Sequence, residues 1–177
     1  MQPNALPSPF FFLMGAGFLL LETQVLSRLA LYFGTTWQVN GIVISALLIS
    51  MLGANTIAAK RSAISRRFIL CGLFVGLAVA YFLPFSKLPF HPGTVGIMAA
   101  GIFAIPVFFA GVLFSKEFEL AHSPSAALGA NVLGAVLGGL LENLSLVIGM
   151  RALLLVAAVV YAIARLALLK KRTLEIA

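Results

Sequence analysis

The sequence predicts an all-α membrane protein with six transmembrane helices and both termini in the cytoplasm. Of its 177 residues, 62% are hydrophobic and only 10% are charged, and the mean hydropathy is +1.10. Soluble domains are about half apolar and a quarter charged, so we expect the additional apolar surface to face lipid. Two further observations support this fold class: the apolar residues fall into six long runs, and the basic residues gather in alternate loops.

Each run is long enough to cross about 30 Å of hydrocarbon, which takes roughly 20 helical residues. The first run is the least regular, because Glu22 and Arg28 could make it break or re-enter instead of crossing. The later runs are separated by segments rich in Gly, Pro, Ser or charge, namely GTTWQ, KRSAISRR, PFSKLPFHPG, SKEFELAHSPS and the short GMR. The predicted spans form one transmembrane domain over residues 1–177 and cover residues 9–33, 37–59, 67–85, 93–114, 125–150 and 152–169.

The distribution of Lys and Arg predicts the orientation. The loops after the second and fourth runs and the C-terminal tail hold eight basic residues, whereas the alternate loops hold only Lys87 and Arg151. Basic loops stay in the cytoplasm, so both termini are expected there. The net charge of +7 needs no nucleic-acid partner, because no basic stripe interleaved with aromatic residues is present.

Several residue patterns typical of enzymes are missing from the sequence. Cys71 is the single cysteine, His91 and His122 stand alone in loops, and the chain has no Asp. These residues offer no metal-ligand spacing and no Ser/His/Asp triad. The start has no positive n-region and no A-x-A-like cleavage site, so we do not expect the first run to be a removable signal peptide. We therefore expect a protein that is not an enzyme and holds no catalytic residue, metal or cofactor.

Small residues in the fifth run predict a helix-packing face. In lipid, helices associate by close backbone approach, which small side chains permit. The run could pack within the chain or form a subunit interface. The small residues recur every fourth position at Ala126, Ala130, Gly134 and Gly138, and shorter versions occur at Gly72 and Gly76 and at Ala100 and Ala104.

Polar residues within the runs are candidate functional residues, since charges at membrane depth usually face a bundle interior, a partner or a watery cavity. Glu22 could make a structural contact, bind a ligand or proton, or touch a partner protein. Asn131 and Glu142 share the small-residue face of the fifth run. Asn40 and Asn55, near opposite ends of the second run, are expected to form interhelical hydrogen bonds.

Arg28 and Glu142 are predicted to pair. Counting a rise of about 1.5 Å per residue, both lie at a similar depth in the outer part of the membrane, whereas Glu22 lies deeper. Arg28 is six residues from Glu22, about 120° around the helix, so these two cannot easily neutralise each other. If the pair forms, Glu22 is the better candidate for a ligand, proton or partner contact.

Three segments carry a resemblance to a known family: the FLLLE run, the FGTTWxVN turn and the GANxLGAxLGG ridge. They resemble the membrane portion of bacterial spermidine synthase-like proteins, which in turn is similar to half of a major facilitator transporter. The resemblance implies a six-helix bundle in the bacterial cytoplasmic membrane. It covers nearly the whole chain, but the soluble synthase domain is absent from this sequence, so the likeness brings no catalytic residue with it. The residues that match the family pattern are Glu22, Trp37, Asn40, Asn131 and Glu142.

Two classes of function follow. The first is a non-catalytic membrane module, either an accessory or scaffold subunit of a larger assembly or the membrane half of a split synthase-like system. The second is a small transporter built as a homodimer of six-helix units, with Glu22 and Glu142 facing its cavity. The expected partners are the lipid bilayer and either other membrane subunits or a second copy of the chain.

Overall fold

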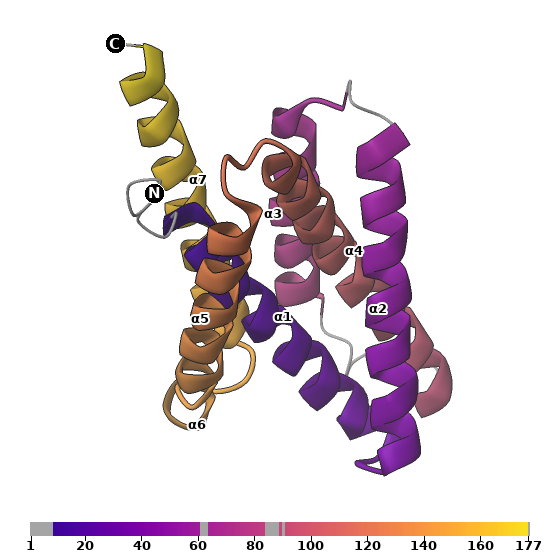
Figure 1. Ribbon diagram of the computed structural model, residues 1–177. Coiled ribbons are helices and arrows are strands. Elements are labelled where there is room, and N and C mark those ends of the chain that lie inside the picture. Colours follow the sequence, from indigo (N-terminus) through magenta and orange to yellow (C-terminus); the bar gives the residue numbers. More distant parts are fainter. Residues whose placement is uncertain (1–8, 61–63, 84–88, 90, 177) are drawn as a thin grey trace. The chain divides into compact units, whose positions relative to one another are not determined.

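The computed structural model describes residues 9–60, 64–83, 89 and 91–176. Within these residues the protein is all-helical and contains no strand (Figure 1). In chain order the helices are α1 (Pro9–Phe33), α2 (Trp37–Lys60), α3 (Arg66–Phe82), α4 (Pro92–Glu119), α5 (Pro124–Glu142), α6 (Ser145–Ile148) and α7 (Leu153–Ile176).

Four helical segments of the described residues are long and apolar enough to cross a membrane. They are Pro9–Phe33, Asn40–Lys60, Thr94–Glu119 and Pro124–Ile148, and a shorter apolar helix covers Leu153–Leu169. The sequence had predicted six spans. The helix α3 has 17 residues, the lower limit of the usual range for a crossing, and two of them are arginines in its first turn.

The helix bounds agree with the sequence prediction at some places and differ at others. The helix α1 runs without a break from Pro9 to Phe33 and therefore continues through Glu22 and Arg28. The helices α4 and α7 continue past the expected ends at residues 114 and 169.

The expected helix over residues 125–150 is divided in the structure. The helix α5 ends at Glu142, and the four-residue α6 follows. At the division, the amide of Asn143 donates a hydrogen bond from Nδ2 to the carbonyl oxygen of Leu140 over 3.2 Å. Such side-chain bonds compete with the helical pattern of the backbone. Gly149 then ends α6 with φ of 84°, a conformation that favours glycine.

The chain forms two compact units. One is the contiguous segment Leu21–Lys116, and the other combines Met1–Leu20 with Glu117–Ala177. Both boundaries fall inside helices, so α1 and α4 each contribute to both units. We refer to them as the central unit and the terminal unit. The expectation of a single transmembrane domain stays a prediction.

In the terminal unit, the small-residue face of α5 packs against the first half of α1. Ala130, Gly134 and Gly138 are buried. A Cβ atom added at Gly134 would collide with the backbone carbonyl of Phe12, and one at Gly138 would lie 2.5 Å from the carbonyl oxygen of Ala16. The contact is reciprocal, because a Cβ at Gly15 of α1 would collide with the carbonyl of Asn131. The two backbones therefore approach as closely as glycine allows.

The helix α7 also packs on α1 in the terminal unit. The ring of Tyr161 is fully buried and lies over Gly17, where an added Cβ would be 2.8 Å from Cζ. Leu153, Leu154, Ala157 and Ala164 are buried on α7 as well. A tyrosine ring thus fills the space that a glycine leaves.

In the central unit, α4 contacts α3 and α2 through glycines. Gly72 of α3 faces the ring of Phe109, and Gly76 faces Pro106, whose Cδ would lie 3.0 Å from an added Cβ. On the α2 side, an added Cβ at Gly111 would lie 3.0 Å from Cβ of Ala54. A helix in the middle of the unit therefore needs small residues where its two neighbours approach.

Side-chain hydrogen bonds join the helices of the central unit near the C-terminal ends of α2 and α4. The Ser115 hydroxyl donates a hydrogen bond to Oδ1 of Asn55, and Gly111 O, at 2.9 Å, is an alternative acceptor. The prediction that Asn55 forms an interhelical hydrogen bond is confirmed. Lys116 Nζ donates to the carbonyl oxygen of Ile64 over 2.6 Å and ties α4 to the segment that precedes α3.

The α1–α5 contact gives a test by substitution. We expect Gly134→Leu or Gly138→Leu to lower the free energy of unfolding by about 3 kcal/mol, the upper part of the usual range for overpacking, because the opposing atoms belong to backbone. Thermal denaturation of the detergent-purified protein measures the change. The controls are Gly129→Leu and Val132→Leu, both at exposed positions of α5. No atom lies within 4 Å of a Cβ added at Gly129. Both substitutions should change the free energy of unfolding only slightly. An equal loss of stability in Gly129→Leu and Gly134→Leu would contradict the contact between α1 and α5.

Candidate functional site

The most deeply buried polar side chain of α1 is that of Gln24. It is 1% exposed, and neither its Nε2 nor its Oε1 has a hydrogen-bond partner among the described residues. A buried amide without hydrogen bonds lowers the free energy of unfolding by about 1–3 kcal/mol unless another molecule binds it. Gln24 therefore presents an unbonded donor and an unbonded acceptor at a buried position of α1.

Glu22 and Arg28 flank this amide along α1, and both are half-buried. Arg28 lies four residues from Gln24 and thus on the same face of the helix. Glu22 lies two residues from Gln24 and points about 160° away from it. The second half of α1 therefore carries polar groups on two opposite sides.

The candidate residues Asn131 and Glu142 lie in the terminal unit. Asn131 is half-buried where α5 meets α1, and its Oδ1 would lie 3.0 Å from a Cβ added at Gly15. Glu142 is half-buried and is the last residue of α5. Arg28 belongs to the central unit and Glu142 to the terminal unit, and their pairing stays a prediction.

Asn40 lies apart from these groups, in the first turn of α2. Its side chain is exposed, and its backbone N–H donates to the carbonyl oxygen of Thr36 over 3.1 Å. Trp37 starts the same turn and is 81% exposed. Aromatic side chains at helix ends are typical of membrane interfaces. An interhelical bond from Asn40 stays a prediction.

Sequence reasoning overlooked Gln24 and Tyr161. The Tyr161 hydroxyl is buried and, like the Gln24 amide, has no hydrogen-bond partner within the described part of the chain. Gln24 could have been found, because a polar residue in the middle of an apolar run deserves the same weight as a charged one. Tyr161 could not, because aromatic residues are common in apolar runs and only packing shows that its ring covers Gly17.

The chemistry that these groups support is binding of polar groups by hydrogen bonds and charge. In the described ranges, no group of three or more His, Cys, Asp or Glu side chains could hold a metal ion. Comparison of the chain with protein-family models, with curated proteins and with solved structures finds no match. The resemblance to the membrane part of synthase-like proteins therefore remains an expectation from the sequence motifs.

Replacing Gln24 tests whether its amide is unsatisfied. Gln24→Met keeps the length of the side chain and removes both polar atoms. We expect the free energy of unfolding to rise by about 1–3 kcal/mol, because an unsatisfied buried amide is removed. Denaturation in detergent measures the change, with Ser45→Ala at an exposed position of α2 as the control. A loss of stability in Gln24→Met would show that a bound molecule or partner subunit occupies the amide.

Proposed function

We propose that the protein is a non-catalytic multi-pass module of a bacterial cytoplasmic membrane, with both termini in the cytoplasm, that serves as an accessory or scaffold subunit of a larger membrane assembly. The membrane half of a split synthase-like system is one form of this proposal. In that form, a separate chain supplies the aminopropyltransferase-like domain.

The observation that carries the proposal is the apolar surface that the units leave uncovered. The buried residues of α5 are small and lie against α1, while its large side chains are exposed. Only 11% of an 18-residue apolar stretch within Pro124–Ile148 is buried, and 22% of such a stretch within Asn40–Lys60. Apolar faces of this extent need lipid or other helices to cover them. The exposed large residues of α5 are Leu128, Val132, Leu133, Val136 and Leu140.

The distribution of basic residues supports the orientation. Lys60 ends α2, Arg66 and Arg67 begin α3, and Lys116 lies near the end of α4. With α2 and α4 running inward and α3 running outward, these four residues share the cytoplasmic side.

A small transporter built as a homodimer is the second candidate. Gln24 favours it, because a buried amide without a partner in the described residues can bind a polar solute. Arg28, one turn from Gln24 on the same face of α1, would add charge selectivity.

A topology experiment tests the placement in the membrane. A reporter fused after Arg172 and a tag inserted between Ser62 and Ser65 should both read cytoplasmic, because basic segments are retained on that side. Alkaline phosphatase and green fluorescent protein fusions give opposite signals on the two sides and check each other. A periplasmic signal at either position would contradict the proposed orientation.

The assembly itself is tested by purification in mild detergent followed by native mass spectrometry. We expect a complex of fixed stoichiometry that contains this chain and at least one other polypeptide. A homodimer with no other chain would support the transporter instead. A monomer that reconstitutes into vesicles without any partner would contradict both candidates.

A further inference from the structure

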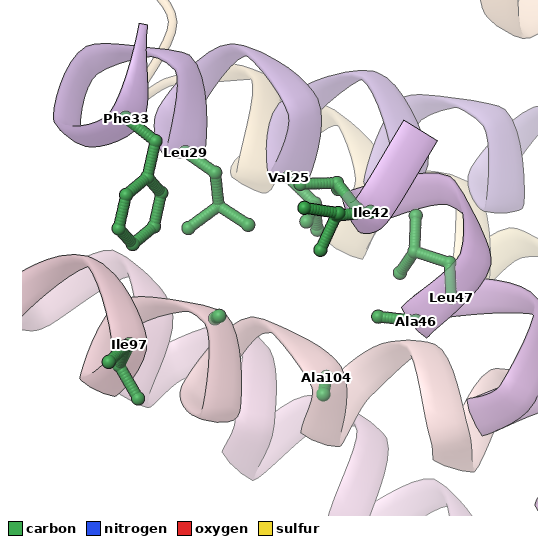
Figure 2. Close-up of a pocket in the computed structure, with 10 residues that line it drawn as sticks. Val25, Leu29, Phe33, Ile42, Ala46, Leu47, Ile97 and Ala104 are labelled. Atoms are coloured by element: carbon green, nitrogen blue, oxygen red, sulfur yellow. The ribbon is translucent and has the colours of Figure 1, made fainter. Parts of the chain in front are cut away.

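The central unit contains an apolar pocket between α1, α2 and α4, with a volume of about 420 Å³. Figure 2 shows Leu29 and Phe33 of α1 pointing toward α4, with Ala46 and Leu47 of α2 at one end. All ten lining residues are apolar: Val25, Leu29, Phe33, Ile42, Val43, Ala46, Leu47, Ile97, Ala100 and Ala104.

Small residues leave this space open. Ala100 and Ala104 lie one turn apart on the same face of α4, and Ala46 faces them from α2. From the sequence, Ala100 and Ala104 were expected to form a helix-packing face. In the structure they line the pocket. Their short side chains do not reach α1 and α2, and larger side chains at these two positions would fill the space between the helices.

We propose that this pocket binds one hydrocarbon chain of a membrane lipid. The inference rests on the proposed residence in a membrane. The apolar lining decides against polar occupants. An extended peptide is excluded because no lining residue offers a hydrogen bond to its backbone, and water does not fill a purely apolar cavity.

The length and position of the pocket fit an acyl chain. From Val25 to Phe33 the pocket follows α1 for about 12 Å, close to the roughly 15 Å depth of one leaflet. Ile42 and Ile97 at its rim are 70% and 71% exposed, so the pocket is open at its side and a chain can enter from the bilayer.

The pocket lies toward the end of the central unit that is opposite the basic residues. Leu47 lies about 20 Å along α2 from Lys60, and Ala104 lies about 18 Å along α4 from Lys116. In the proposed orientation the bound hydrocarbon chain therefore belongs to a lipid of the outer leaflet. The polar turn Thr35–Thr36 and the exposed Asn40 lie at that end of the unit, where the head group of the lipid would be.

Photo-crosslinking tests the proposal. The probe is a phospholipid with a diazirine midway along one acyl chain, added at low mole fraction to vesicles of phosphatidylethanolamine and phosphatidylglycerol. We expect crosslinks, located by mass spectrometry, to concentrate on the pocket residues and to be fewer at Leu48 and Leu52, which are exposed on the opposite side of α2. Equal yields at pocket and exposed residues would overturn the proposal, because lipid would then contact the unit without a site.

Two substitutions on α4 give a matched comparison. Ala104→Phe fills the pocket and should lower crosslinking there about tenfold, the change that corresponds to losing about two buried methylene groups. Met98→Phe places a ring at an exposed position about 100° around α4 from Ile97 and about 120° from Ala104, and should leave crosslinking unchanged. Unchanged pocket labelling in Ala104→Phe would overturn the proposal.

A competition arm identifies the source of the chain. If a polyprenol added to the vesicles removes pocket crosslinks beyond simple dilution, the preferred occupant is an isoprenoid chain, and if not, it is an acyl chain. Either result supports a hydrocarbon site. A flotation assay separates the two proposals. If the protein does not co-float with the vesicles, its proposed residence in a membrane is contradicted. If it co-floats but the pocket is not labelled, only the proposed lipid site is contradicted.

Discussion

The close approach of glycine to a neighbouring helix is the interaction on which both compact units depend. In the terminal unit, Gly134 and Gly138 bring the backbone of α5 onto that of α1. In the central unit, Gly76 and Gly111 do the same for the contacts of α4. Such contacts contribute dispersion energy, which falls off steeply with the distance between the two helices. One added methyl group would collide with the opposing backbone at Gly134 and Gly138, and at Gly76 and Gly111 it would force the neighbouring atoms to shift by a few tenths of an ångström.

The sequence predicts some of the helices and their packing well. Pro9 and Gly34 bound α1 at its expected ends, since proline begins a helix readily and Gly34 takes φ of 86° directly after the last turn. The bond of Asn55 to a neighbouring helix was also expected from its polar side chain in an apolar run. In these cases the signal is local or depends on one residue type. The division of α5 from α6 depends instead on a weak competition between side-chain and backbone hydrogen bonds at Asn143, which hydropathy does not register.

The candidate site was harder to predict, because burial depends on all neighbours together. Reasoning from charge selected Glu22 and Arg28 and passed over Gln24, although the structure buries Gln24 most deeply. The same limit applies to Ala100 and Ala104. Small residues at four-residue spacing permit close packing, but whether a helix fills the space depends on the side chains opposite. Here the apolar pocket and the buried amide lie on different faces of α1, so one helix borders a hydrocarbon site and a polar one.

The division of the chain into units has a consequence for biosynthesis. The central unit is contiguous, so all of its residues are synthesised before residue 117 is added. The first half of α1, in contrast, finds α5 and α7 only after that point, and its glycines stay uncovered until then. Contacts between distant parts of a chain form late and leave apolar surface exposed in the meantime. Until α5 and α7 are made, the glycine face at Gly15 and Gly17 is therefore open to chaperones and to association with the wrong helix.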